Sequence, residues 1–295
     1  MKFSPYKIYA YFSLLRPHQW LKNIIVGMPL FFHDTDLDIK NVYSCLILFI
    51  LFSLIASFVY VLNDVSDIAE DRKHILKKKR VIASGAISRR EAMVIALLLI
   101  LLTVLCFFIL EIKQSTWSVL LAYIFINIGY SFYFKNIPLV EMCIVASGFG
   151  LRISAGSFET DISLSPWIMM CVISGSLFIV IGKRFSDLKI SSKNLMRKVF
   201  QSYTEEFLKM QLTLQAAVLC SVYLMFVFSD YGIQKFGVYL PVTGLPVFLS
   251  IQRYVQLVIV FSEGSDPTKL ILSDKFILIC AFVTACMFIG LKVIS

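Results

Sequence analysis

The sequence predicts an all-α polytopic membrane protein, and three observations carry that prediction. First, 58% of the 295 residues are hydrophobic and only 16% are charged, whereas soluble domains are about half apolar and about a quarter charged. Second, the apolar residues form runs that are long enough to cross a bilayer, which takes roughly 20 residues each. Third, the basic residues are unevenly shared among the loops between these runs. An ordinary soluble globule, a disordered chain and a small disulfide-linked domain are excluded.

About nine transmembrane helices are expected, one for each apolar segment. The segments cover residues 18–33, 41–62, 91–110, 116–135, 138–157, 165–182, 207–229, 237–254 and 275–293. The first is the weakest, because it is short and contains Lys22, Gly27 and Pro29. These spans leave no room for a separate soluble domain. We therefore expect a single transmembrane domain over residues 1–295, in which residues 1–15 form an interfacial segment.

The basic residues predict the orientation of the chain, because loops on the cytoplasmic side carry an excess of Lys and Arg. If the N-terminus is placed inside, only Lys40, Lys113, Lys235 and Lys292 fall outside, and Arg152 lies within a span. We therefore expect an integral protein of a bacterial inner or plasma membrane with a cytoplasmic N-terminus. A net charge of +9 on a soluble protein would suggest nucleic acid. In this chain the basic residues of the cytoplasmic loops account for the positive charge. We therefore expect the lipid bilayer as a partner and no nucleic acid.

An acidic motif follows the second span, where residues 63–71 read NDVSDIAED. On a continuous helix, Asp64, Asp67 and Asp71 would share one face. Three neighbouring carboxylates repel one another and are costly at a membrane boundary unless a cation neutralises them. Mg²⁺ commonly binds through one or two carboxylates together with substrate phosphates. The motif therefore predicts a Mg²⁺ site, with a solvated helix start as the alternative.

A basic loop comes directly after the acidic motif and contains Lys73, Lys77 and Arg80. Metal ligands beside a cluster of cations are typical of a diphosphate site, since the metal bridges phosphate oxygens while Lys and Arg neutralise the remaining charge. The alternative is that the loop only carries topology-setting charge that meets anionic lipid.

The order Asn-Asp-x-x-Asp-x-x-x-Asp, followed by a basic loop that ends in Ile-Ala-Ser-Gly at residues 82–85, resembles the UbiA superfamily of intramembrane prenyltransferases. The resemblance implies a nine-helix UbiA-like bundle whose active site faces the cytoplasm. It also implies that Asn63, Asp64, Asp67 and Asp71 hold Mg²⁺ and the diphosphate of the donor. The family commonly has Arg-Pro where this chain has Arg80-Val81, and we expect that change to alter loop stiffness more than chemistry.

Features further along the chain resemble one branch of the superfamily, the decaprenyl-phosphate phosphoribosyltransferases. The second Asp-rich motif of other members is missing after the sixth span, where residues 182–188 read GKRFSDL. The other matching features are YSFYFK at 130–135, Glu141, Arg152, Arg253-Tyr254, GSDP at 264–267 and Asp274. In that branch position 141 is often Asp and position 187 is often Glu, so both carboxylates here differ in length by one methylene.

The resemblance to this branch implies both substrates and a set of site residues. The donor would be 5-phosphoribosyl diphosphate, the acceptor a polyprenyl phosphate that attacks ribose C1, and the leaving group pyrophosphate bound to Mg²⁺. Catalytic roles fall to Asp64, Asp67, Asp71 and Glu141. The implied substrate-binding residues are Asn63, Lys22, Lys73, Lys77, Arg80, Tyr130, Lys135, Arg152, Lys183, Arg184 and Asp187. Lys135 has a simpler alternative as a topology charge and Arg152 as a packing charge, although arginine within a span usually has a function.

Two other functions compete with this one. A prenyltransferase of the same fold would move an isoprenoid from its diphosphate to an aromatic or other acceptor, and the missing second acidic motif counts against it. A transporter for phosphorylated lipids or Mg²⁺ would place acidic residues near the midplane on paired broken helices, whereas the acids here gather at the edge of a span. The sequence does not determine the oligomeric state, and a homo-oligomer is one of the possible states.

Overall fold

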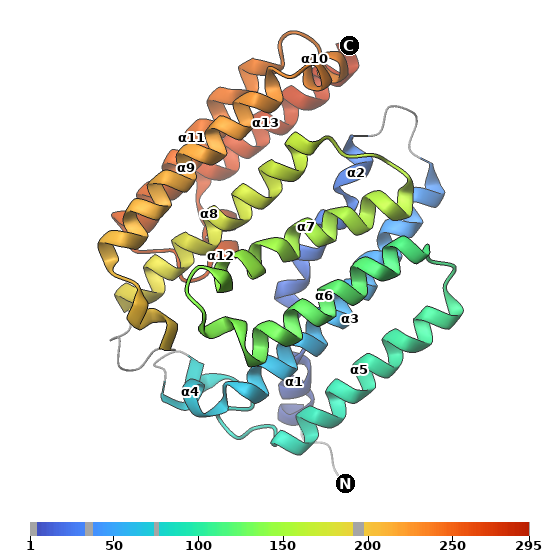
Figure 1. Cartoon of the computed structure of the whole chain (residues 1–295), viewed down its shortest axis with the longest axis vertical. Coiled ribbons are helices and arrows are strands. Elements are labelled where there is room, and N and C mark those ends of the chain that lie inside the picture. The colour runs from blue at the N-terminus through green and yellow to red at the C-terminus, as the bar shows by residue number, and fades with distance from the viewer. Residues whose placement is uncertain (1–4, 33–37, 74–76, 191–197, 295) are drawn as a thin grey trace. The chain divides into compact units, whose positions relative to one another are not determined.

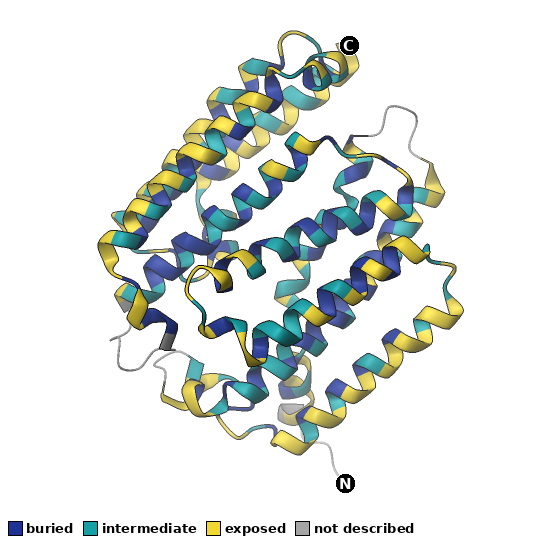
Figure 2. Ribbon diagram, in the orientation of Figure 1, coloured by how far each residue is buried: buried dark blue, intermediate teal, exposed yellow. Residues whose placement is uncertain are grey.

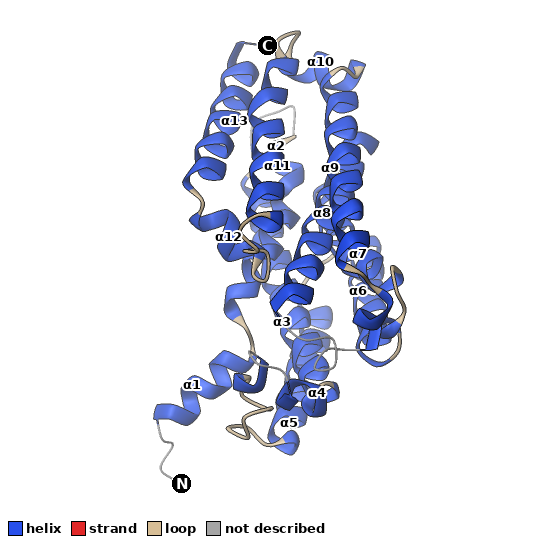
Figure 3. Cartoon of the chain, turned by 90° about the vertical axis from the view of Figure 1, so that its left-hand side faces the viewer, coloured by secondary structure: helices blue, strands red, loops and turns tan. Residues whose placement is uncertain are grey.

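A computed structural model of the chain describes residues 5–32, 38–73, 77–190 and 198–294. All regular structure within these ranges is helical, and they contain no strand (Figure 3), which confirms the predicted all-α class. The chain divides into two compact units, which are described separately below: unit 1 is Met1–Leu164 with Asn194–Val199, and unit 2 is Ser165–Lys193 with Phe200–Ser295. Residues 1–4 of the expected interfacial segment lie outside the described residues.

Unit 1 contains the first ten elements of the chain. These are α1 (Pro5–Leu14), η1 (Pro17–Gly27), α2 (Met28–Phe31), α3 (Ile39–Ser66), α4 (Ile68–Lys73), η2 (Lys77–Lys79), α5 (Arg89–Ile109), α6 (Gln114–Phe132), η3 (Phe134–Asn136) and α7 (Val140–Thr160). The remaining elements are α8 (Pro166–Ile190), η5 (Lys198–Ser202), α9 (Glu205–Val227), α10 (Asp230–Phe236), η6 (Leu240–Thr243), α11 (Gly244–Ile259), α12 (Pro267–Ser273) and α13 (Lys275–Ile294). All of these belong to unit 2, except that η5 begins in unit 1.

Seven helices in the described residues are long and apolar enough to cross a membrane, and they coincide with seven of the nine predicted segments. The chain is therefore an integral membrane protein. The segment predicted at 18–33 forms η1 and α2 instead of one α-helix, because Pro17 and Pro29 lack a backbone N–H and favour the start of a helix over its interior. The segment predicted at 138–157 is α7, which is made more polar by Glu141, Arg152 and Glu159. The number nine remains a prediction.

The core of unit 1 forms around α3, which packs against α5, α6, α7 and η1 (Figure 1). Leu48, Phe52 and Ile55 of α3 are completely buried and belong to one apolar cluster with Leu120 of α6. α5 covers a different part of α3 and leaves much of its own apolar surface exposed (Figure 2). An exposed apolar face of this length is expected on a helix that borders lipid.

The N-terminal helix α1 is attached to the beginning of α5 through Glu91. Ser88 caps α5, since its Oγ accepts a hydrogen bond from the N–H of Glu91 and its own N–H donates to Glu91 Oε2. Lys7 Nζ lies 2.8 Å from Glu91 Oε1, and the hydroxyl of Tyr11 donates to the same oxygen at 3.0 Å. One carboxylate therefore completes a helix cap and holds α1.

Candidate active site

The acidic motif lies where α3 ends. Asp67 caps α3 by donating its N–H to the carbonyl of Asn63 at 3.0 Å, and α4 begins at the next residue. Ser66 Oγ donates to the same carbonyl at 2.9 Å. Side-chain bonds of this kind compete with the regular helical pattern, so a polar stretch of sequence ends α3 and keeps the motif together in a short bend.

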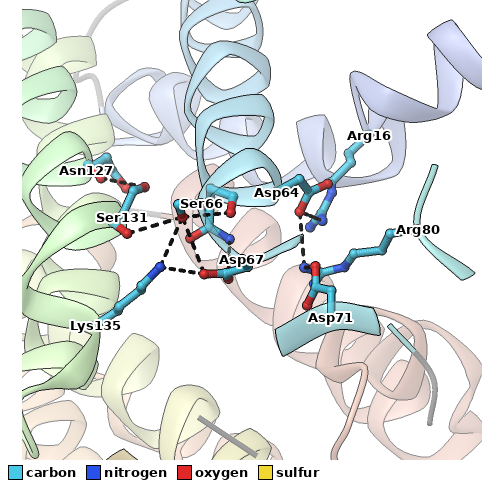
Figure 4. A network of polar contacts seen from close by, with 10 residues as sticks. Arg16, Asp64, Ser66, Asp67, Asp71, Arg80, Asn127, Ser131 and Lys135 are labelled. Carbon is cyan, nitrogen blue, oxygen red and sulfur yellow. Dashed lines mark hydrogen bonds and ion pairs between the residues drawn. The ribbon is translucent and has the colours of Figure 1, made fainter. Parts of the chain in front are cut away.

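Asp64 and Asp71 lie on the same side of this bend and share one guanidinium group. Arg80 NH1 lies 3.1 Å from Asp64 Oδ1 and 2.7 Å from Asp71 Oδ2, while Arg16 NH2 lies 2.5 Å from Asp64 Oδ1 (Figure 4). Both aspartates are only 3% exposed. Burying a charge is costly unless it is paired and hydrogen-bonded, and these two arginines supply the pairing.

Arg16 was not predicted as a site residue, because the sequence marks it only as one of the inner basic residues. It adopts a left-handed backbone conformation, φ 53° and ψ 58°, directly before Pro17. A non-glycine residue rarely has positive φ, and a proline disfavours the α region for the residue before it. The guanidinium also lies 5.2 Å from the centre of the Tyr60 ring. The position before a proline at the start of the first apolar segment is the only sequence signal for it.

Asp67 pairs with a different cation, Lys135 of η3 (Figure 4). Lys135 Nζ lies 2.5 Å from Asp67 Oδ1 and 3.0 Å from Ser66 Oγ, and Ser66 Oγ is also 3.3 Å from the carbonyl of Ser131 on α6. Asp67 is 1% exposed and Lys135 is 6% exposed. The expectation of one shared face therefore holds for Asp64 and Asp71, but it is wrong for Asp67, because the bend after Ser66 turns that carboxylate toward α6 and η3.

The oxygen atoms of the motif fit a hard cation in their chemistry. Asn63 Nδ2 donates to Asp67 Oδ2 at 3.2 Å, whereas the buried Asn63 Oδ1 accepts no hydrogen bond from any described residue. A buried acceptor without a donor costs about 1–3 kcal/mol, and carboxylate and amide oxygens are ligands of Mg²⁺ and Ca²⁺. In the described part of the chain no three His, Cys, Asp or Glu side chains converge as a ready-made metal cage. The aspartates are neutralised by arginine and lysine instead.

Burial also changes the acidity of this site. It raises the pKa of Asp71 above its ordinary value, and the ion pair with Arg80 opposes that rise. The nearby carboxylates of Asp64 and Asp67 raise the pKa of Asp71 further. A carboxyl group whose pKa is shifted by burial and by neighbouring charges is a frequent property of functional sites.

The other residues predicted in unit 1 take varied positions. Lys22 is half-buried on η1, and Lys77 is half-buried at the first position of η2. Lys73 is exposed at the end of α4. Tyr130 is half-buried on α6, and Glu141 is 1% exposed in the first turn of α7.

Arg152 makes its contacts with the protein and away from the aspartates. Its Nε donates to Asn23 Oδ1 at 2.7 Å, its NH1 donates to the carbonyl of Gly148 at 2.7 Å, and its NH2 donates to the hydroxyl of Tyr123 at 2.8 Å. The side chain is 5% exposed. Every nitrogen of this guanidinium is therefore engaged by α6, α7 or η1.

Unit 2 holds the remaining predicted residues near the end of α8. Arg184 is 8% exposed, and its NH1 lies 3.7 Å from Asp187 Oδ2, one turn further along the helix. Lys183 is half-buried beside them. The loop before α12 is tied to this helix end, because the N–H of Gly264 donates to the buried Ser186 Oγ at 2.9 Å.

A second ion pair of unit 2 joins α11 to the residue before α13. Arg253 donates from Nε and NH2 to Asp274 Oδ2, at 3.1 and 2.9 Å. The hydrogen bonds from Arg253 lower the pKa of Asp274 below its ordinary value. Both residues belong to the ordered set of features noted in the sequence, and the structure brings them into direct contact.

The chain matches the UbiA prenyltransferase family over residues 24–259 and belongs to that family. It is 31% identical over 273 residues to the decaprenyl-phosphate phosphoribosyltransferase of Corynebacterium glutamicum, covering 90% of this chain and 82% of that protein. It is 32% identical to the decaprenyl-phosphate phosphoribosyltransferase of Mycobacterium tuberculosis, covering 90% of this chain and 89% of that protein. These similarities confirm the resemblance to the UbiA family and to this branch of it.

Solved structures of the family have the same fold. A UbiA homologue of Archaeoglobus fulgidus, bound to GPP and Mg²⁺, superposes with a TM-score of 0.71 at 19% identity, covering 96% of this chain and 99% of that one. A UbiA homologue of Aeropyrum pernix gives a TM-score of 0.65 at 13% identity, covering 93% and 98%. The predicted UbiA-like helical fold is thereby confirmed.

Proposed function

We propose that the protein is a Mg²⁺-dependent polyprenyl-phosphate phosphoribosyltransferase of the membrane. It transfers 5-phosphoribose from 5-phosphoribosyl diphosphate to a polyprenyl phosphate and releases pyrophosphate. The observation that carries the proposal is the identity of about one third with curated decaprenyl-phosphate phosphoribosyltransferases over most of both chains. The buried arrangement of three aspartates with three cations supports it, because a diphosphate bound with a metal needs both kinds of charge.

The acidic motif is proposed to hold the metal. Asn63, Asp64, Asp67 and Asp71 supply hard oxygen donors, and the Asn63 Oδ1 atom that accepts no hydrogen bond from the described residues supports this assignment. Bound Mg²⁺ would supply charge neutralisation for the departing pyrophosphate. Mg²⁺ is present in a structure of a protein with this fold.

The cations of the cluster are proposed to bind the diphosphate of the donor. Arg16, Arg80 and Lys135 already contact the three aspartates, so a diphosphate bound beside these aspartates would lie within their reach. Arginine matches phosphate oxygens through paired N–H donors, and lysine acts as a compact charge. Lys73 and Lys77 are proposed to contribute from the edge of the same site.

The reaction itself needs little proton transfer. An oxygen of the lipid phosphate, which is already anionic, forms a bond to ribose C1, and the bond from C1 to the diphosphate oxygen breaks with its electron pair leaving on pyrophosphate. Positive charge that develops on the sugar is stabilised by a nearby carboxylate, by analogy with glycoside hydrolysis, and Glu141 is proposed for that role. Lys22 and Tyr130 of unit 1 are proposed to bind the phosphate and ribose groups of the substrates. The substrate-binding roles expected for Lys183, Arg184 and Asp187 of unit 2 remain predictions.

The side of the membrane is also part of the proposal. Lys73, Lys77 and Arg80 belong to the loop that the positive-inside rule places in the cytoplasm. A water-soluble phosphorylated sugar would then reach the site from the cytosol, whereas the lipid substrate would enter from the bilayer. The N-terminus would lie on the same side.

A transfer assay tests the proposal against its alternative. Purified protein in detergent receives Mg²⁺, a polyprenyl phosphate and 5-phosphoribosyl diphosphate labelled in the ribose, and label is expected in the lipid extract. A parallel reaction with a labelled prenyl diphosphate and an aromatic acceptor is expected to give no product. Transfer from the prenyl diphosphate alone would support a prenyltransferase and overturn the proposal.

A further inference from the structure

The unusual element η1 needs support from its neighbours. It is a 3₁₀-helix of 11 residues, whereas 3₁₀ runs longer than about four residues are uncommon because their hydrogen-bond geometry is poor. It packs against α3 and α7. Its first residue, Pro17, follows Arg16 directly, so the position of η1 determines where the Arg16 guanidinium lies.

One polar stripe on α3 fixes the register of η1. The stripe consists of Ser53, Ser57, Tyr60 and Asp64. The last three follow Ser53 by four, seven and eleven positions, a spacing that places all four on one face of a helix. Asn23 Nδ2 donates to Ser53 Oγ at 3.0 Å, and Trp20 Nε1 donates to Ser57 Oγ at 3.0 Å. The two segments therefore run antiparallel, and a slip of η1 along α3 would break both hydrogen bonds.

The same stripe ends at the candidate active site. Arg16 contacts its last two members, since its guanidinium stacks on the Tyr60 ring and pairs with Asp64. Ser57 Oγ also lies 2.9 Å from the carbonyl of Leu15. The hydrogen bonds of η1 and the ion pair of Arg16 thus belong to one continuous contact along α3.

Arg152 holds the second half of η1 through Asn23. Asn23 is completely buried, and it accepts from Arg152 Nε while it donates to Ser53. The Arg152 guanidinium also lies within 6 Å of three aromatic ring centres, and this cage is formed by Phe52, Tyr123 and Phe149. Aromatic faces attract a desolvated cation. Among the described residues Arg152 forms no ion pair with a carboxylate, so its partners are the cage and η1.

A second contact places the same turn of α7 against η1. A Cβ atom added to Gly156 would lie only 1.9 Å from the carbonyl oxygen of Val26. Gly156 is one helical turn after Arg152, so both residues present the same face of α7. The two helical segments therefore meet backbone to backbone where Arg152 reaches Asn23.

We propose that Arg152 is a positioning residue, which holds η1 through Asn23 in the register that places Arg16 on Asp64. This inference rests on the proposed diphosphate site. It assigns Arg152 no contact with substrate, because all its nitrogens donate to the protein. Its effect on the site is transmitted through Arg16.

A double-mutant cycle tests this role, with Mg²⁺-dependent binding of inorganic pyrophosphate measured by calorimetry on the full chain in detergent. We expect Arg152→Gln to weaken binding about tenfold, within the range that coupled neighbours show. Arg16→Ala should weaken it at least as much, and the double variant should equal Arg16→Ala alone. If the affinity losses of the two single variants multiply in the double variant, the inference is overturned. It is also overturned if Arg152→Gln binds pyrophosphate as tightly as the unaltered chain.

Two variants of Asn23 keep the test decisive if Arg152→Gln does not fold. Asn23→Leu preserves size but removes the bond to Arg152, and it should weaken pyrophosphate binding as Arg152→Gln does. Asn23→Asp keeps an acceptor for Arg152, and it should bind nearly as well as the unaltered chain. Equal affinity in both variants would contradict the role.

The choice of ligand separates this inference from the proposed function. Pyrophosphate is the leaving group of a phosphoribosyl donor and of a prenyl diphosphate alike, so the cycle is independent of which reaction the protein performs. If the unaltered chain does not bind pyrophosphate, the proposed diphosphate site fails and the positioning role fails with it.

Discussion

At the scale of single residues, an almost completely buried lysine compensates the charge of Asp67. Lys135 and Asp67 are 6% and 1% exposed, and their charged atoms lie 2.5 Å apart. Removing one partner of a buried ion pair leaves the other uncompensated and costs about 3–5 kcal/mol. The pair therefore contributes to the fold as well as to the candidate site.

Lys135→Met should lower the free energy of unfolding by about 3 kcal/mol, measured as a lower melting temperature in detergent. The double variant Lys135→Met with Asp67→Asn should recover most of the loss, because no buried charge remains. Lys79→Met, at an exposed lysine, is the matched control and should not change the melting temperature. A double variant no more stable than Lys135→Met would contradict this account.

The raised pKa of Asp71 predicts how stability depends on pH. Because the pKa of the folded state lies above the ordinary value of 3.8, the fold favours the protonated carboxyl, and stability falls as the pH rises through the raised pKa. Asp71→Asn should remove this part of the pH dependence of the melting temperature above that ordinary value. It should also abolish Mg²⁺-dependent activity. An unchanged pH profile in Asp71→Asn would show that another group is responsible.

The sequence could predict most of the motif residues but not their partners. Asp64, Asp67 and Asp71 follow from the spacing of carboxylates after a span. Arg16 is 48 residues before Asp64, and no local pattern indicates that they meet. The separation of Asp67 from the other two depends on the bend after Ser66, which arises from side-chain hydrogen bonds that spacing does not reveal.

At the scale of elements, the long apolar runs were predicted well because length and composition determine a span. Seven predicted segments coincide with helices that can cross a membrane. The first segment differs, because two prolines and the contacts of Trp20 and Asn23 with α3 favour a 3₁₀ form over a regular α-helix. These contacts are between elements, and they have no signature within the segment itself.

The close packing of η1 on α7 gives a prediction for glycine substitutions. Gly156→Ala should lower the melting temperature strongly and weaken pyrophosphate binding, because the added Cβ would clash with the Val26 carbonyl. Gly290→Ala in α13 is the matched control, since a Cβ there would meet nothing within 4 Å. A glycine replaced by alanine within a helix gains about 0.5–1 kcal/mol. Equal melting temperatures for the two variants would contradict the packing described here.

At the scale of the whole molecule, the fold class and family follow from patterns that run along the entire chain, and the structure and the relatives agree with them. The single domain expected over residues 1–295 remains a prediction. The division into two compact units comes from contacts that the sequence does not display. Orientation is likewise predicted from charge alone.

Labelling from one side of the membrane tests the orientation. A cysteine replacing the exposed Lys40, in the first turn of α3, should react with a membrane-impermeant maleimide in intact cells, because this end of α3 is expected outside. A cysteine replacing the exposed Lys79 should react only after the cells are opened. Both signals are measured above that of the unaltered chain with its seven cysteines. The reverse pattern would place the active site on the other face.

A doubly labelled donor shows which bond of 5-phosphoribosyl diphosphate the protein breaks. The 5-phosphoribosyl diphosphate carries one isotope in the ribose and another in the terminal phosphate of its diphosphate, and it is mixed with Mg²⁺, polyprenyl phosphate and purified protein. The ribose label should move to the lipid extract, and the phosphate label should stay in water as pyrophosphate. Asp67→Asn should stop both the transfer of ribose and the release of pyrophosphate. Both labels together in the lipid, or neither label moved, would contradict the proposed phosphoribosyl transfer.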